Sequence, residues 1–84
     1  MTYTIRLTRQ AAKDVEQLTP RLREKLKDIL RRRIAVDPFG GKPLVGDLKG
    51  YYSVRLSYKD RIVYTIRKDQ QMVVVIRART HYGE

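Results

Sequence analysis

The segment from Gly50 to Ile66, GYYSVRLSYKDRIVYTI, constrains the fold of this chain more than any other stretch. Apolar and polar residues alternate in two runs, 52–56 and 62–66, separated by a polar break at 57–60. This pattern is typical of a β-hairpin, whose side chains point alternately to the two faces of a sheet. One face receives an apolar set: Val54, Leu56, Ile62, Tyr64 and Ile66. The other face receives Ser53, Arg55, Ser57, Arg61, Val63 and Thr65, so we expect it to present two arginines to solvent.

The length and the residue usage exclude several classes of protein. The chain has 84 residues, which suffices for one small domain, so we expect a single domain over residues 1–84. It has no cysteine and one histidine, which excludes a disulfide framework and a multi-histidine metal site and leaves only carboxylates to ligate a hard cation. No apolar run approaches the roughly 20 residues of a membrane span, and residues 1–10 show no apolar leader. We expect a cytoplasmic protein without a membrane partner, a metal or a small-molecule cofactor.

The charge indicates the kind of partner. Nineteen Lys and Arg residues stand against nine Asp and Glu residues, which gives a formal net charge of +10. Surfaces that serve solubility mix both signs with a smaller excess, whereas a strongly basic chain is typical of proteins that bind polyanions. We therefore expect a nucleic acid partner.

The N-terminal half predicts one strand and two helices. Residues 2–8 alternate and indicate a half-buried strand, and Thr8 suits the N-cap of a short amphipathic helix over residues 9–18. Thr19-Pro20 marks a second helix start, and its apolar face continues to about Val36. This second helix carries seven basic residues against two acidic ones, a net charge of +5 that is half the charge of the protein. A solvated face with i,i+4 ion pairs and a binding role explain this charge equally well.

The C-terminal half predicts a loop, the hairpin and a last strand. Residues 37–50 hold four of the five glycines and two of the three prolines, so we expect a long loop without a phosphate-binding fingerprint. Residues 72–80, MVVVIRART, read as a strand apolar enough to lie inside the sheet. Its alternation predicts one face with Met72, Val74, Ile76 and Ala78 and another with Val73, Val75, Arg77, Arg79 and His81. The expected fold is α+β, with element order β-α-α-β-β-β. A mostly antiparallel sheet packs one face under a helical hairpin and leaves the other face open and lined by arginine.

Two segments resemble a known family. The pattern L-x-G-Y-Y-S-x-R-L-x-x-x-x-R-I-V-Y from Leu48 to Tyr64, followed by R-x-H-Y from Arg79 to Tyr82, is similar to the RelE/ParE superfamily of toxins. These toxins belong to type II toxin–antitoxin systems, and the terminal R-x-H-Y favours the RelE- and YoeB-type messenger-RNA interferases. The resemblance implies the RelE-like fold and metal-independent cleavage of RNA on the ribosome through attack by the ribose 2′-OH.

The resemblance also implies catalytic residues. Arg61 matches the arginine that braces the scissile phosphate, and Arg55 matches a second basic position beside it. His81 and Tyr82 match the terminal pair, the histidine as an acid or base and the tyrosine as a contact to substrate. YoeB-type toxins carry a glutamate base where an ungapped alignment places Lys42, so the general base remains open between His81, Lys42 and no single residue.

Further basic residues are expected to contact RNA: Arg77, Arg79, Lys42, Lys49, Lys59, Arg31, Arg32 and Arg33. The last three would anchor the chain on ribosomal RNA through phosphates. The expected partners are a cognate antitoxin, the ribosome and its messenger RNA. Two alternatives remain, a ParE-like inhibitor of DNA gyrase and a basic RNA-binding module without chemistry.

Overall fold

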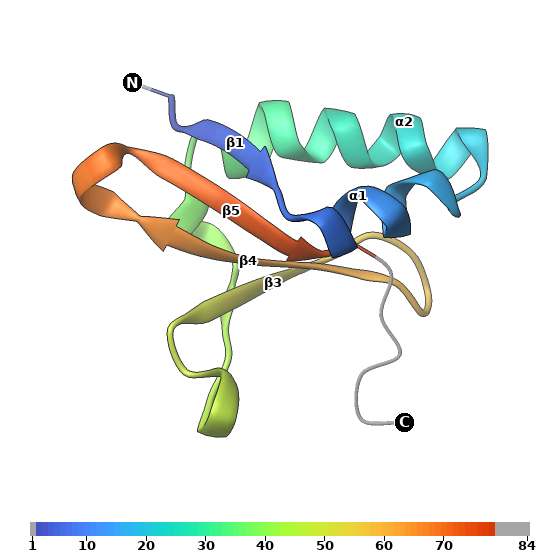
Figure 1. Cartoon of the computed structure of the whole chain (residues 1–84). Helices are drawn as coiled ribbons and strands as arrows, with labels where there is room; N and C mark the ends of the chain where they lie inside the picture. The colour runs from blue at the N-terminus through green and yellow to red at the C-terminus, as the bar shows by residue number, and fades with distance from the viewer. Residues whose placement is uncertain (1, 79–84) are drawn as a thin grey trace.

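A computed structural model describes residues 2–78, and the predicted α+β class is confirmed. The chain runs through β1 (Thr4–Leu7), α1 (Arg9–Glu16), α2 (Pro20–Ile29), β2 (Lys42–Pro43), β3 (Tyr51–Arg55), β4 (Arg61–Arg67) and β5 (Met72–Arg77). The strands form one sheet in the order β1-β5-β4-β3-β2. The two helices lie together on one face of this sheet (Figure 1).

The sheet is mostly antiparallel, as predicted. The ladders β2–β3, β3–β4 and β4–β5 are antiparallel, whereas β1 pairs with β5 in parallel, from Thr4 opposite Met72 to Leu7 opposite Val75. Parallel strands need a long connection, and residues 8–71, which include both helices and the hairpin strands, connect β1 to β5. Strand β5 thus has a neighbour on either side, which confirms its predicted place inside the sheet.

Side-chain caps start both helices where the sequence predicts. The Thr8 hydroxyl accepts a hydrogen bond from the Ala11 N–H at 3.1 Å, and the Thr19 hydroxyl accepts one from the Leu22 N–H at 3.3 Å. Such caps satisfy backbone donors that have no partner inside a helix. The α-helical part of this segment, α2, ends at Ile29. One π-helical turn follows directly over Leu30–Ile34.

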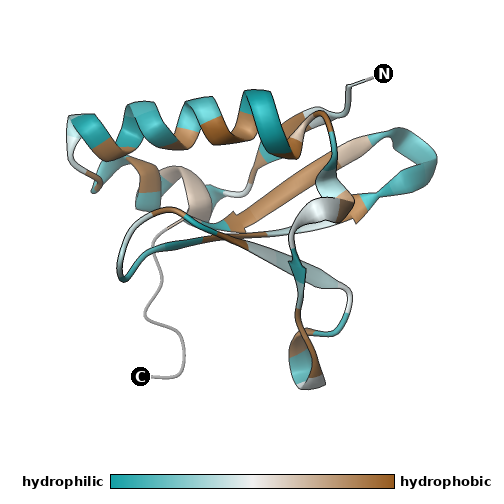
Figure 2. Cartoon of the chain, turned by 180° about the vertical axis from the view of Figure 1, so that it is seen from behind, coloured by the Kyte–Doolittle hydropathy of each residue, from teal (hydrophilic) through white to brown (hydrophobic). Residues whose placement is uncertain are grey.

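The core lies between the helices and the sheet, and the apolar bands of the helices face the sheet (Figure 2). The predicted apolar face of the hairpin is confirmed, because Val54, Leu56, Ile62 and Tyr64 are buried and Ile66 packs against them. The helical contribution comes from one side of each helix: Ala11, Leu18, Leu26, Ile29 and Ile34.

The structure corrects two expectations about the strands. Residues 37–50 are not only a loop, because Lys42 and Pro43 pair with Ser53 and Tyr52 and add a fifth strand at the sheet edge. An edge strand tolerates proline, which lacks the N–H that a central strand would need.

The second correction concerns strand β5. Its alternation was expected to place Ala78 opposite Val73 and Val75, but all three lie in the same core. The register explains this, because Tyr64 pairs with Val75 whereas Val63 pairs with Arg77, which leaves Ile76 as an extra residue. A bulge of this kind shifts the alternation by one position.

Candidate functional site

Two arginines face each other across the hairpin. Arg55 at the end of β3 is the register partner of Arg61 at the start of β4, so both side chains leave the same face of the sheet. Arg55 is exposed and Arg61 is partly exposed. Like charges directly opposite on two strands destabilise a sheet by roughly 0.2–1 kcal/mol. A pair retained at this cost suits a site that receives an anion between the two guanidinium groups.

The register extends this surface across the sheet. Lys42 on β2, Ser53 on β3, Val63 on β4 and Arg77 on β5 follow one another as register partners. We call the side of the sheet that carries Arg55, Arg61, Ser53, Val63 and Lys42 the arginine face. Arg6, an exposed residue of β1, was not among the site residues predicted from the sequence. Its register partner is Val74 on β5, and Val74 in turn pairs with Thr65 on β4, so Arg6 belongs to the same row across the sheet as Thr65. The alternation of residues 2–8 is the signal that would have included Arg6.

The arginine face is less open than predicted. Ser53 is 4% exposed and Val63 is fully buried, although neither belongs to the core under the helices. Within the described residues the Ser53 hydroxyl has no hydrogen-bond partner.

Arg77 has an intramolecular partner. Its Nε donates to Oδ2 of Asp14 on α1 at 3.0 Å, and the Ala78 N–H donates to the same oxygen at 3.1 Å. Gln10 donates to the other carboxylate oxygen at 2.9 Å. Burial raises the pKa of Asp14, but the hydrogen bonds from Ala78, Gln10 and Arg77, together with the charge of Arg77, outweigh burial and hold this pKa below its ordinary value. Asp14 therefore ties α1 to the end of β5, from which residues 79–84 continue.

Sequence reasoning missed Asp14, although a signal was present. The residue falls in helical phase with the apolar positions Ala11 and Leu18, where an acidic side chain is out of place unless it has a buried partner.

The other predicted site residues lie in separate places. Lys49 and Lys59 are exposed in the segments on either side of β3. Arg31, Arg32 and Arg33 are exposed on the π-helical turn of the helical layer, across the sheet from the arginine face. Arg79, His81 and Tyr82 lie outside the described residues.

Ion pairs on a solvated face account for part of the charge of the second helix. Arg32 pairs with Asp28 at 3.0 Å and Lys27 with Glu24 at 3.7 Å, and all four side chains are more than half exposed. Ion pairs this exposed contribute little stability. Arg23 in addition donates to the backbone carbonyls of Val15 and Leu18, so Arg23, Lys27 and Arg32 all have intramolecular partners.

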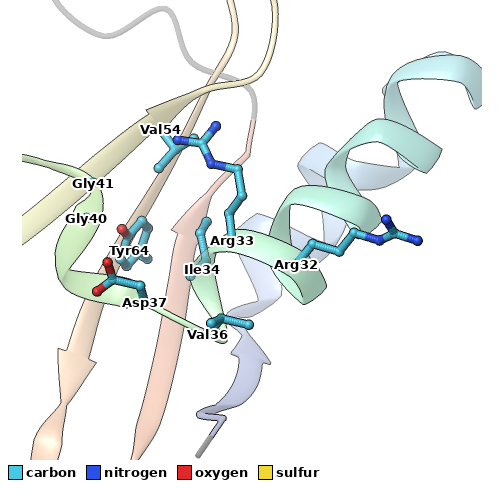
Figure 3. Close-up of a pocket in the computed structure, with 9 residues that line it drawn as sticks. All are labelled: Arg32, Arg33, Ile34, Val36, Asp37, Gly40, Gly41, Val54 and Tyr64. Atoms are coloured by element: carbon cyan, nitrogen blue, oxygen red, sulfur yellow. The ribbon is translucent and has the colours of Figure 1, made fainter.

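A cavity of about 300 Å³ lies between the end of the helical layer and the hairpin (Figure 3). Arg33 reaches across it toward Val54, while Arg32 points away. Tyr64 lines it, and its hydroxyl donates to the Pro38 carbonyl at 2.7 Å. Burial, and next the neighbouring Tyr52, raise the pKa of Tyr64 to about 12. Neither Arg55 nor Arg61 lines this cavity, so the cavity and the arginine pair are separate features of the hairpin.

Residues 2–78 contain neither a candidate metal site nor a candidate membrane span. No three His, Cys, Asp or Glu side chains in this part of the chain gather closely enough to hold a metal ion. No helix there is both long enough and apolar enough to cross a bilayer.

Solved structures define the class of protein to which this fold belongs. The toxin–antitoxin complex RelBE2 from Mycobacterium tuberculosis contains a chain that matches at TM-score 0.86 and 29% identity, over 96% of this chain and 100% of that one. A YoeB/ParE toxin from Agrobacterium tumefaciens matches at TM-score 0.84 and 32% identity, over 94% of this chain and 99% of that one. The fold is that of RelE/YoeB toxins.

Sequence comparison identifies the family within that class. The model of the YoeB-like toxins of bacterial type II toxin–antitoxin systems matches residues 8–82. Toxin YoeB of Streptomyces coelicolor is 39% identical over 75 residues, which cover 84% of this chain and 81% of that protein. The chain belongs to the YoeB-like toxin family, as its motifs predicted.

Proposed function

We propose that residues 1–84 form a single-domain, metal-independent endoribonuclease of the cytoplasm that cleaves messenger RNA on the ribosome and so stops translation. The observation that carries this proposal is the cross-strand pair of Arg55 and Arg61 in a chain of the YoeB-like family. Two guanidinium groups on one rigid hairpin offer several N–H donors and two fixed charges. This arrangement suits a phosphodiester that gains negative charge during reaction.

The cleavage needs three tasks. The ribose 2′-oxygen bonds to the adjacent phosphorus while the bond from phosphorus to the 5′-oxygen breaks, which leaves a 2′,3′-cyclic phosphate and a free 5′-hydroxyl. Arg61, with Arg55 beside it, stabilises the charge on the phosphorane. A base takes the 2′ proton and an acid gives one to the leaving 5′-oxygen. His81 is our candidate for one of these proton transfers, and Lys42 is the alternative candidate for the base. Tyr82 would contact the substrate.

The remaining basic residues would hold RNA through its phosphates. Lys42 lies on the arginine face, and Arg77, Arg79, Lys49 and Lys59 would extend the contact along the message. Arg31, Arg32 and Arg33 would anchor the helical layer on ribosomal RNA. Contacts of this kind are independent of sequence and sensitive to salt.

A cognate antitoxin is the proposed regulator. The related toxin from Mycobacterium tuberculosis was solved as a toxin–antitoxin complex. We infer that the antitoxin of this chain brings an acidic, amphipathic segment that folds on the basic surface and blocks it.

The decisive test is cleavage of a defined message bound in the ribosomal A site by the purified full-length chain. We expect cleavage in the presence of EDTA and a 2′,3′-cyclic phosphate on the 5′ fragment. A parallel supercoiling assay with DNA gyrase tests the main alternative. Intact message together with inhibited gyrase would replace the ribonuclease by a ParE-like activity, and binding to ribosomes without either effect would favour a non-catalytic module.

A further inference from the structure

The turn of the hairpin presents an unusually exposed aromatic side chain. Tyr58 is 94% exposed, more than any other large apolar or aromatic residue among residues 2–78. Three other tyrosines are engaged in packing: Tyr64 is buried and stacks on Tyr52, and Tyr3 meets Phe39 edge to face. Packing within the described residues therefore gives no reason for an aromatic side chain at position 58.

The turn that carries Tyr58 is held by four hydrogen bonds. The Leu56 and Ser57 N–H groups donate to the Asp60 carbonyl at 2.9 and 3.1 Å. The Ser57 hydroxyl donates to Oδ2 of Asp60 at 3.0 Å and accepts from the Asp60 N–H at 3.1 Å. Asp60 is only 7% exposed, so its carboxylate is turned inward and satisfied within the turn. The ring of Tyr58 thus stands on a fixed base and has only two rotatable side-chain bonds to order on binding.

Three basic residues lie within three positions of Tyr58 along the hairpin: Arg55, Lys59 and Arg61. Lys59 follows Tyr58 directly and is exposed, and the register pair of Arg55 and Arg61 closes the two strands at the base of the same turn. A flat aromatic face beside several cations matches an unpaired nucleotide, whose base stacks on the ring while its phosphates meet the cations. A peptide partner would instead need an apolar surface around the ring, and the neighbours Ser57, Lys59 and Asp60 offer none.

We propose that Tyr58 is a stacking site for one unpaired RNA base next to the phosphate held by Arg55 and Arg61. The proposal rests on the proposed ribonuclease function and adds a substrate-binding residue to it. The ring supplies a contact that does not depend on salt and tolerates any base, whereas the cations supply one that salt weakens.

The test measures binding of the full-length chain to ribosomes carrying a message whose A-site riboses are 2′-O-methylated, so that cleavage cannot occur. Tyr58→Ala should weaken binding by roughly 5- to 150-fold, the usual range for loss of one stacked base, with an unchanged salt dependence. Tyr58→Phe and Tyr58→Trp should bind like the wild type because they keep an aromatic face. Lys59→Gln should instead flatten the salt dependence by about 0.7–0.9 of a unit. The matched control is Val45→Ala, because Val45 is also highly exposed, at 84%. This variant should bind the ribosomes with the affinity and the salt dependence of the wild type.

Replacing single bases of the message by abasic sites then identifies the stacked position. At that position the wild type should lose as much affinity as Tyr58→Ala loses on the intact message, and the variant should lose nothing further. Equal binding by wild type and Tyr58→Ala would overturn the stacking proposal while leaving the ribonuclease function intact. Failure of the wild type itself to bind programmed ribosomes would overturn both. Weaker capture of the antitoxin by Tyr58→Ala, with RNA binding unchanged, would reassign the ring to a protein contact.

Discussion

At the scale of single residues, the hairpin places Arg55 and Arg61 where they repel each other. Repulsion between them is a cost to the free protein and an advantage once a phosphate lies between them. Stability and activity should therefore respond in opposite directions when one of the two is removed.

Arg61→Ala tests this relation. Cleavage of ribosome-bound message should fall by roughly 10²–10³-fold, by analogy with the loss of one donor to a developing oxyanion. Ribosome binding should change little, because anchoring is spread over many basic residues, and the free energy of unfolding should stay level or rise by up to about 1 kcal/mol. Single-turnover cleavage and urea unfolding measure the two effects. Arg61→Lys is the control that keeps the charge but loses the planar fork of donors. Wild-type cleavage by Arg61→Ala would place the active site elsewhere.

Asp14 is the residue whose titration the structure makes most informative. Its pKa is lowered in the folded state, so it contributes stability above its unfolded pKa of about 3.9, and this contribution is lost as the pH falls through the folded value. Asp14→Asn should cost about 1–3 kcal/mol at pH 7, since it disturbs buried hydrogen bonds. The difference from wild type should shrink below about pH 4.

Urea unfolding at several pH values measures this difference. Asp28→Asn is the matched control, since Asp28 pairs with Arg32 while more than half exposed and should matter little at any pH. A constant difference between wild type and Asp14→Asn across the acid range would contradict the assignment.

At the scale of elements, the segment between the helices and the hairpin is fixed by contacts with β4. The Tyr64 hydroxyl holds the Pro38 carbonyl, and a side chain at Gly41 would collide with that hydroxyl. A residue of the central sheet thus positions β2, which carries Lys42 onto the arginine face.

Tyr64→Phe removes that hydrogen bond and should destabilise the fold by about 1–3 kcal/mol at pH 7. The pKa of Tyr64 rises to about 12 in the fold, so the contribution of its neutral hydroxyl is complete below the ordinary value of about 10 and is lost as the pH rises toward 12. The stability difference between wild type and Tyr64→Phe should therefore close over that interval. Chemical denaturation between pH 7 and 12 measures it, with Tyr58→Phe as the exposed control. If the stability difference between wild type and Tyr64→Phe stayed constant up to pH 12, the raised pKa of Tyr64 would not contribute to stability.

The helical layer carries the second basic surface. Reversing Arg31, Arg32 and Arg33 to glutamate should weaken ribosome association and flatten its logarithmic salt dependence by about 2–3 units, because fewer counterions are released. Stability should change little, since these side chains are exposed. The matched control reverses Arg9, Lys13 and Lys68, which are equally exposed on other elements. Equal losses in both triple variants would show that net charge matters and position does not.

At the scale of the whole molecule, the two basic surfaces lie on opposite sides of the core. The arginine face looks away from the helices, and the arginines of the π-helical turn lie on the helical layer. A chain of net charge +10 with this layout offers two separate surfaces to polyanions. In our proposal one surface binds the message and the other binds the ribosome.

Expression in bacteria tests the toxin role at this scale. Induction of the chain alone should arrest growth and translation, and co-expression of the antitoxin from the adjacent reading frame should restore both. The Arg61→Ala variant, produced at the same level, is the control that separates the effect of catalysis on growth from the effect of protein overproduction. Normal growth with abundant soluble wild-type protein would count against a toxin.

The local structure and the family follow from the order of the amino acids alone. Period-two alternation fixed the hairpin and its apolar face, and Thr8, Thr19 and Pro20 fixed both helix starts, because these signals act between residues close in the chain. The motif from Leu48 to Tyr64 identified the toxin family that the comparisons confirm.

How distant segments meet depends on the assembled fold. The parallel pairing of β1 with β5, the extra residue Ile76, the edge strand at Lys42–Pro43 and the bond from Arg77 to Asp14 join segments that no local pattern relates. Each depends on hydrogen-bond partners and packing space that exist only after the helices cover the sheet. For the same reason the alternation predicted that Ser53 and Val63 lie on an open face of the sheet, whereas both residues are buried in the assembled fold.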